Sequence, residues 1–225
     1  MYKPTEEPSY KQDNACDPAN DPQATIGGNG YNRDGESESA ATASAQPDKL
    51  LNIPQEMRER PQWCLAATDK RPLQLNKANA DPTNPATWST FDAVYAKAKE
   101  YGLGVGYVLT KDDPYTCIDL DIKDTTPAEH IKLIHKIRSD FQSYTESSQS
   151  GRGYHVWVKG SVPKGRKRDS VEVYSSERFI VCTGDIVNEL PIKNRQGLLS
   201  SMYLQMSPEE ADVELPPDQP VVGRQ

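Results

Sequence analysis

Apolar and polar residues alternate with period two in several short stretches, and this alternation predicts β-strands. The clearest stretch is residues 115–122, where apolar residues alternate with Asp119 and Asp121. Successive side chains of a strand point to opposite faces, so the two carboxylates share one face and the apolar residues take the other. The same reading predicts further strands at residues 62–66, 70–73, 105–110, 143–148, 154–159, 171–174 and 178–183.

Helical spacing of apolar residues predicts three helices. The first begins at Ser89, with Asp92 three residues later as a weak capping box, and ends at Tyr101-Gly102. Its predicted apolar stripe consists of Phe91, Val94, Tyr95 and Ala98.

The second predicted helix has Thr126 as its N-cap, Pro127 at the first position and Glu129 at the third. Its predicted core-facing residues are Ile131, Ile134 and Phe141. A short third helix is expected over residues 194–204. Together these elements predict an α/β (α+β) fold in which sheet and helices form separate layers.

The ends of the chain differ in composition from its centre. Residues 1–47 and 207–225 are rich in small and acidic residues or proline, and they lack an apolar period. Such segments cannot bury enough apolar surface to offset chain entropy, so we expect both to be disordered and residues 48–206 to fold as one domain.

The net charge of −7 is unevenly distributed: residues 1–47 carry −5, residues 207–225 carry −4, and the centre carries +2. Residues 152–168 contain six cations and no acid. The centre of the chain is therefore compatible with a polyanionic partner.

The four cysteines are far apart and form no Cys-x-x-Cys pair, so the sequence predicts neither a zinc site nor a disulfide framework. Cys117 and Cys182 lie in apolar runs and are expected to be buried thiols. No signal peptide or membrane-spanning stretch is predicted, and a reducing cytoplasm fits best.

The Asp119/Asp121 pair has two interpretations. Two like charges about 6–7 Å apart on one strand face repel each other, and a divalent cation such as Mg²⁺ or Mn²⁺ compensates them. Alternatively, the strand lies at a sheet edge and water solvates both carboxylates.

Downstream, residues 148–153 read Ser-Gln-Ser-Gly-Arg-Gly and predict a tight link between two strands. Its backbone N–H groups, hydroxyls and Arg152 suit a phosphate chain. His155 follows this loop, which favours a ligand-binding role over that of a satisfied structural histidine.

Two later strands carry further charged residues. Glu172 lies in Val-Glu-Val-Tyr, either as a third oxygen ligand with the two aspartates or as an outward-facing edge residue. Three carboxylates from two strands suit a pair of metal ions. Arg178 opens the run that ends in Thr183-Gly184, either to contact a triphosphate or only to pair with Glu177 or Asp185.

In this order, Ile-Asp-Leu-Asp, Ser-x-Ser-Gly-x-Gly-x-His, Val-Glu-Val-Tyr and Arg-Phe-x-x-x-Thr-Gly resemble the archaeo-eukaryotic primase superfamily. The likeness is closest to the bifunctional primase–polymerase domains of phages and plasmids and covers roughly residues 53–185. It implies a primase-type mixed sheet with an RRM-like catalytic half flanked by helices.

The resemblance also implies residue roles. Asp119, Asp121 and Glu172 would bind two Mg²⁺ or Mn²⁺ ions, with His155 as a further catalytic residue. His155 would hold the incoming triphosphate with Ser148, Ser150, Arg152 and Arg178. The expected DNA-binding cations are Lys70, Lys159, Lys164, Arg166, Lys167 and Arg168, with Lys70 also a candidate for phosphate contact.

The implied function is a template-directed nucleotidyltransferase, a DNA primase/DNA polymerase that makes or extends primers on single-stranded DNA in phage or plasmid replication. Its expected partners are template, primer, NTP or dNTP, and a replicative helicase, and the expected state is a monomer. Two alternatives stay open: a metal-dependent nuclease, and a non-catalytic module that binds single-stranded DNA or initiates replication.

Overall fold

The computed structural model describes residues 48–206. The predicted disordered segments, residues 1–47 and 207–225, lie outside this range. The helical elements are η1 (Lys49–Asn52), α1 (Gln55–Arg58), η2 (Pro85–Thr87), α2 (Phe91–Tyr101), α3 (Ala128–Phe141) and α4 (Gln196–Met206). The strands are β1 (Trp63–Ala66), β2 (Pro72–Leu73), β3 (Gly104–Leu109), β4 (Tyr115–Leu120), β5 (Thr145–Ser147), β6 (Tyr154–Lys159), β7 (Arg166–Arg168), β8 (Val171–Tyr174), β9 (Arg178–Cys182), β10 (Ile186–Asn188) and β11 (Lys193–Asn194).

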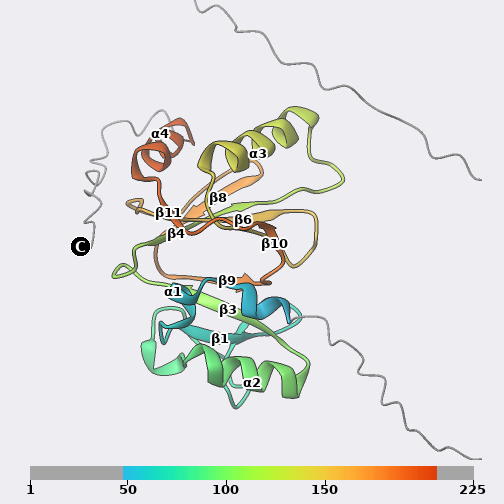
Figure 1. Ribbon diagram of the computed structural model, residues 1–225, viewed down its shortest axis with the longest axis vertical. Coiled ribbons are helices and arrows are strands. Elements are labelled where there is room, and N and C mark those ends of the chain that lie inside the picture. Colours follow the sequence, from blue (N-terminus) through green and yellow to red (C-terminus); the bar gives the residue numbers. More distant parts are fainter. Residues whose placement is uncertain (1–47, 207–225) are drawn as a thin grey trace, which may run out of the picture. The chain divides into compact units, whose positions relative to one another are not determined.

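These strands form two sheets stacked on each other (Figure 1). The smaller has the order β2-β1-β3-β9 and is antiparallel throughout. The larger has seven strands in the order β10-β5-β6-β4-β8-β7, with β11 added parallel to β6. The predicted mixed α/β fold with separate layers is confirmed.

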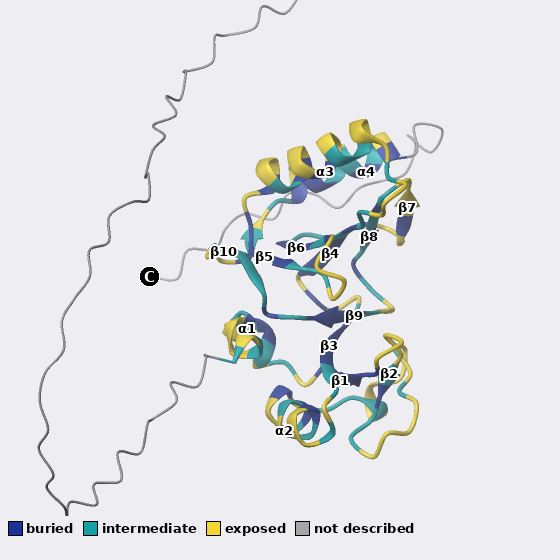
Figure 2. Ribbon diagram, turned by 90° about the vertical axis from the view of Figure 1, so that its right-hand side faces the viewer, coloured by how far each residue is buried: buried dark blue, intermediate teal, exposed yellow. Residues whose placement is uncertain are grey.

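Helices α3 and α4 cover the outer face of the larger sheet (Figure 2). The period-two alternation of β4 sends Ile118 and Leu120 into this layer, where they join Ile134 and Phe141 of α3 and Leu199 of α4. Each of these side chains is almost fully buried. Fully burying such residues contributes about 1.5–3 kcal/mol each, so this layer holds the sheet's outer face firmly.

A second core lies between the two sheets and extends to α2 below the smaller one. The Trp157 ring of β6 meets the Tyr107 ring of β3 edge to face, with centroids 5.9 Å apart. Cys117 and Cys182 contribute to the same core, which confirms them as buried thiols. Because apolar side chains fill this interior, polar residues on the inner face of the larger sheet need polar partners there.

The first predicted helix starts later than expected. Thr90, rather than Ser89, is the N-cap of α2 and accepts a hydrogen bond from the Ala93 N–H. Ser89 instead pairs with Trp63 through two backbone hydrogen bonds of 3.0 and 2.8 Å. The predicted end is confirmed, because Gly102 adopts the left-handed conformation at φ 66°.

The predicted capping box of α3 is wrong. Pro127 is the N-cap, and the Thr126 hydroxyl accepts from the Lys123 N–H in the preceding turn. A threonine side chain can satisfy a turn as readily as a helix end, and here the turn competes successfully. On the core face Ile137 replaces Ile131, which is only half-buried.

The sequence pattern missed the short elements β7, β10, β11, η1, η2 and α1, whose two to four residues are too few to show a period. Among the helices of residues 48–206, none combines the length and apolar character needed to cross a lipid bilayer.

Candidate active site

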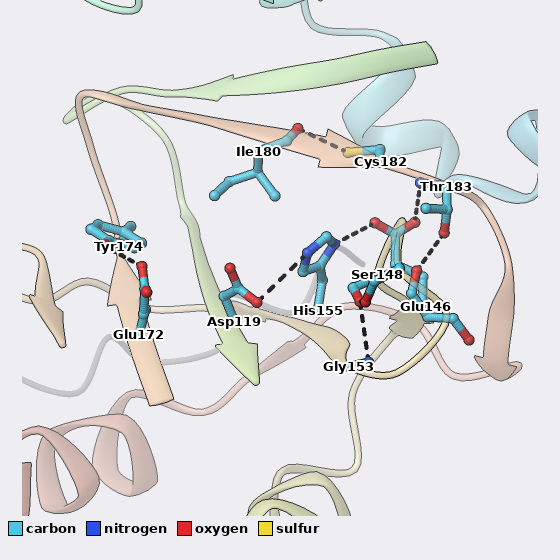
Figure 3. A network of polar contacts seen from close by, with 12 residues as sticks. Asp119, Glu146, Ser148, Gly153, His155, Glu172, Tyr174, Ile180, Cys182 and Thr183 are labelled. Atoms are coloured by element: carbon cyan, nitrogen blue, oxygen red, sulfur yellow. Dashed lines mark hydrogen bonds and ion pairs between the residues drawn. The ribbon is translucent and has the colours of Figure 1, made fainter. Parts of the chain in front are cut away.

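A row of ionisable residues, here called the acid row, crosses the larger sheet on its inner face. Asp119 of β4 is directly opposite Glu172 of β8 on one side and His155 of β6 on the other. The row continues from Glu172 to Lys167 of β7 and from His155 to Glu146 of β5. Directly paired residues of antiparallel strands point to the same face, so all five residues share one face of the sheet. Figure 3 shows the side chains of Asp119, Glu172, His155 and Glu146 on the side of β9, a strand of the smaller sheet.

Asp121 lies just past the end of β4. Its backbone N–H still donates to the Ser170 carbonyl oxygen, which continues the pairing with the chain before β8. Its carboxylate is about half exposed and lies 3.3 Å from the Lys123 ammonium. The two aspartates are thus close, but only Asp119 belongs to the covered part of the sheet.

The electrostatic environment of Asp119 disfavours its charge. Burial raises the pKa of this carboxyl, and His155 opposes the shift with its Nε2 3.8 Å from Oδ1. The charges of Glu172 and Asp121 raise the pKa further, and Lys70 lowers it. The net shift of the Asp119 pKa is upward, because burial and the two neighbouring carboxylates outweigh His155 and Lys70.

Glu172 is surrounded by donors. Its carboxylate accepts from the Lys167 ammonium and, at 2.7 Å, from the Tyr174 hydroxyl. The Arg178 guanidinium lies 3.6 Å away. Burial alone would raise the pKa of Glu172, but these contacts outweigh it and the pKa is lowered. Arg178 thus pairs with the acid row, instead of with Glu177 or Asp185.

The donor set suits a hard divalent cation, because Asp119, Asp121 and Glu172 all offer carboxylate oxygens. As they stand, no three acidic, histidine or cysteine side chains within residues 48–206 converge closely enough to hold a metal ion. Asp121 and Glu172 instead contact Lys123, Lys167 and Arg178. Metal binding by this set therefore requires the carboxylates to exchange ammonium and guanidinium partners for the ion.

A cleft of about 380 Å³ opens beside the acid row. Asp119 and His155 form part of its wall on the larger sheet. The opposite wall includes residues 178–181 of β9 and residue 177, which precedes this strand. Three cations line it: Lys70 and Arg71 from the β1–β2 turn, and Arg178. A cleft with Lys70, Arg71 and Arg178 on one side and the Asp119 carboxylate on the other suits a phosphorylated ligand that is bound with metal ions.

His155 is held from behind by a residue that the sequence pattern did not single out. Its Nδ1 lies 3.2 Å from Oε1 of Glu146, which is fully buried (Figure 3). Burial by itself would lower the pKa of His155, but the hydrogen bond to Glu146 and the charges of Glu146 and Asp119 outweigh it, and the pKa is raised. A carboxylate in the buried run Tyr-Thr-Glu-Ser was the only sequence signal for Glu146.

The Ser-Gly-Arg-Gly loop forms the predicted tight link between β5 and β6. Gly151 has φ 72°, and a Cβ on Gly153 would lie 2.3 Å from the Leu120 carbonyl oxygen. The N–H groups of residues 151–153 donate within the loop, to Ser148 and Ser150. They are therefore not the bare donors that the sequence suggested.

The side chains of this loop also point elsewhere. Arg152 pairs with Asp124 at 2.7 Å, and of residues 148–152 only Gln149 lines the cleft. A phosphate role for Ser148, Ser150 and Arg152 stays a prediction, and it requires the loop to rearrange.

The predicted DNA-binding cations do not form one surface. Lys159 lies at the other end of β6, opposite Tyr115, and pairs with Glu56 at 2.6 Å. Arg166 is buried against the Tyr203 ring. Lys164, Lys167 and Arg168 are exposed on or beside β7, while Lys70 lies in the cleft.

No protein-family model matches the chain. A curated protein, the DNA primase-polymerase of Nitratiruptor phage NrS-1, is 36% identical over 134 residues. The chain is similar to a phage DNA primase-polymerase. The match covers 55% of this chain but 19% of the phage protein, so the chain spans about a fifth of that relative's length. The relative supports the likeness to phage primase–polymerases, while membership of the wider primase superfamily stays a prediction.

Proposed function

We propose that residues 48–206 form a nucleotidyltransferase domain that makes or extends primers on single-stranded DNA from NTPs or dNTPs. The observation that carries the proposal is the pairing of Asp119 with Glu172 beside a cleft lined by Lys70, Arg71 and Arg178. The phage relative is named for the same activity, which supports the choice of this chemistry.

Asp119, Asp121 and Glu172 would hold two Mg²⁺ or Mn²⁺ ions. When bound, such a pair lowers the pKa of an attacking hydroxyl and offsets the charge that develops on the leaving pyrophosphate. The upward shift of the Asp119 pKa supports this role, because crowded carboxylates gain most from a nearby divalent charge.

The cations of the cleft would bind the polyphosphate. Lys70 and Arg71 come from the β1–β2 turn, whereas Arg178 comes from β9, so the phosphates would lie between two elements of the smaller sheet and the acid row. The His155 imidazole would add a hydrogen bond from Nε2, the ring nitrogen on the side of Asp119. Cations placed before the ligand arrives lower the cost of binding a polyanion and orient it for in-line attack.

The template would be held through its phosphates by the exposed cations near β7: Lys164, Lys167 and Arg168. Contacts to a phosphate backbone are independent of base sequence and weaken as salt rises. A replicative helicase partner, a monomeric state and action in the host cytoplasm complete the proposal, and they are carried by the family resemblance.

One incubation separates the candidate functions. The chain is mixed with a single-stranded DNA template, with or without an annealed primer, labelled dNTPs or NTPs, and Mg²⁺ or Mn²⁺. We expect labelled products longer than the primer or, without a primer, new short strands. Shortened DNA would favour the nuclease, and a bound but unchanged strand would favour a non-catalytic binding module.

The matched control for this incubation is Asp113→Asn. Asp113 is also a buried carboxylate, but it contacts Arg60, Gln62 and Tyr107 and does not line the cleft. Asp113→Asn should retain incorporation, whereas Asp119→Asn should lose it. Equal activity of the wild type and Asp119→Asn would refute the proposed site.

A further inference from the structure

A second hollow, which we call the Trp88 hollow, has a volume of about 400 Å³ and adjoins the cleft. Its lining comes from the segment before β1, the end of β3 with the turn that follows, and the loop before α2. Pro82 and Glu177 line both the cleft and the Trp88 hollow. Ligand pockets measure about 300–1,000 Å³, so a nucleotide that fills the cleft leaves the Trp88 hollow open to a second group.

The Trp88 hollow offers ring surfaces rather than hydrogen-bond donors. Trp88 lines it together with three prolines, Pro61, Pro82 and Pro85. Proline has no backbone N–H. The indole nitrogen of Trp88 already donates to the Asp81 carbonyl oxygen at 2.8 Å. These residues therefore suit a flat, apolar group that needs no donor from them.

The charges around the Trp88 hollow balance. Arg60 and Lys111 line it, and so do Asp112 and Glu177. The Arg60 guanidinium is also paired with buried Asp113 at 2.9 Å. A polyphosphate would gain little from a wall with as many acids as cations. An uncharged nucleobase would gain more, because every base has a face that stacks on an indole.

Pairing between strands decides which nucleobase can reach Trp88. Bases in a primer–template duplex stack on one another, whereas an unpaired base has free faces for an aromatic side chain. We propose that the Trp88 hollow takes an unpaired base of the single-stranded DNA template, stacked on the Trp88 indole. The identity of this strand as a template rests on the proposed function.

A run of neighbouring residues leads from the cations near β7 to the Trp88 hollow. Lys167 of β7 pairs with Glu172, and Arg178 lies 3.6 Å from the same carboxylate. Glu177 precedes Arg178 in the chain and lines the hollow. On the wall of the hollow, Lys111 is exposed, and its ammonium makes no ion pair within residues 48–206. It can therefore contact a phosphate beside the stacked base.

The three tryptophans of the chain allow a direct test. Trp63 and Trp157 have no solvent exposure, so only Trp88 can contact a ligand from solution. Stacking on a base quenches indole fluorescence and shields the ring from acrylamide. Oligo-dT should therefore quench the fluorescence over the same concentrations at which the anisotropy of labelled oligo-dT reports binding. An abasic strand of equal length retains the phosphates, and it should bind more weakly and leave the fluorescence unchanged.

Variants at Trp88 should change the affinity for single-stranded DNA selectively. Trp88→Ala should weaken oligo-dT binding about tenfold, a size typical of one lost stacking contact, and leave the binding of dATP with Mn²⁺ unchanged. Trp88→Phe retains a ring and should restore most of the affinity. The matched control is Tyr101→Ala, because Tyr101 is also a half-buried aromatic residue but does not line the hollow. This control should bind oligo-dT like the wild type.

Oligo-dT that binds the wild type without changing its tryptophan fluorescence would overturn the proposal, and this measurement needs no variant. Equal quenching by the abasic strand would overturn it in favour of phosphate binding, and equal quenching by dATP with Mn²⁺ in favour of the incoming nucleotide. Quenching by a polyproline peptide instead of oligo-dT would assign the surface to proline-rich ligands, which also bind aromatic grooves.

The proposed base site and the proposed function fail in different ways. Incorporation of nucleotides with an unchanged Trp88 signal would refute the base site alone. Quenching by oligo-dT in a chain that incorporates no nucleotide would refute the polymerase activity alone.

Discussion

Asp119 and Glu172 face each other directly across β4 and β8, and both side chains point toward the cleft-side face of the sheet. They lie 53 positions apart in sequence, and only the antiparallel pairing of these strands brings them together. Two adjacent carboxylates repel each other unless a cation lies between them. This relationship underlies the first two predictions.

Replacing Asp119 with Asn should separate activity from stability. Nucleotide incorporation should fall on the order of 10²–10³-fold, because a ligand for the reacting centre is lost. The free energy of unfolding should stay at or rise above the wild-type value, by up to about 1 kcal/mol, because a buried and repelled charge is removed. Urea denaturation measures the stability, and primer extension measures the activity. A variant that is less stable than the wild type but keeps wild-type activity per folded molecule would contradict the prediction.

Mn²⁺ binding should depend on the acid row. We expect Asp119→Asn/Glu172→Gln to weaken Mn²⁺ binding at least about tenfold, measured by the electron paramagnetic resonance signal of the free ion. EDTA should abolish incorporation, and added Mn²⁺ should restore it. Asp113→Asn is the control, and a doubly substituted chain that binds Mn²⁺ like the wild type would place the ion elsewhere.

His155→Ala should act mainly on nucleotide binding. The ring lies in the wall of the cleft and does not belong to the proposed metal ligands, so the KM for dNTP should rise about tenfold or more while kcat changes less. Steady-state kinetics at varied dNTP measure the split. A lowered kcat with an unchanged KM would instead indicate a role in the chemical step.

Template binding should distinguish cations that the sequence grouped together. Lys164→Ala/Arg168→Ala removes two exposed charges near β7 and should reduce the slope of log affinity against log salt by about 1.4. Lys159→Ala should leave the slope unchanged, because Lys159 pairs with Glu56 at the far end of β6. Fluorescence anisotropy of labelled single-stranded DNA measures both slopes, and equal effects would contradict the placement of the template.

The contribution of Asp48, the first described residue, to the stability of the fold should depend on pH. Asp48 accepts from Lys99 and Tyr95 of α2, and the Lys99 hydrogen bond is the main reason that the pKa of Asp48 is lowered. A lowered native pKa favours the ionised carboxylate in the folded state. Its contribution is therefore complete above the unfolded pKa and is lost as pH falls through the native one.

Asp48 is also the N-cap of η1, where its side chain accepts from the Leu50 N–H. Asp48→Asn should cost about 0.5 kcal/mol of unfolding free energy at neutral pH, since Asn can keep this capping hydrogen bond and loses only the charge. In acid, below the native pKa of Asp48, the two proteins should be equally stable. Urea titrations at the two pH values test this, and a difference that persists in acid would show that the charge is not its source.

Some features of the site were readable from local sequence. The alternation in Ile-Asp-Leu-Asp and Val-Glu-Val-Tyr predicted which side chains share a face. In the structure Asp119 and Glu172 share one face of the sheet, and Leu120 and Val173 lie on the other. The end of α2 at Gly102 was equally predictable. Backbone alternation and left-handed glycines depend only on neighbouring residues, so a short window of sequence contains the information.

The sequence by itself therefore determined the strands that carry the acids, the faces on which these acids lie and the mixed α/β class. Only the tertiary structure decided that Arg178 pairs with Glu172, that Arg71 enters the cleft, and that Glu146 supports His155. Only the tertiary structure shows that Lys159 and Arg166 lie apart from the other basic residues, against Glu56 and Tyr203. Partners of this kind depend on strand order and on the stacking of two sheets, which join residues far apart in the chain and leave no local pattern to read.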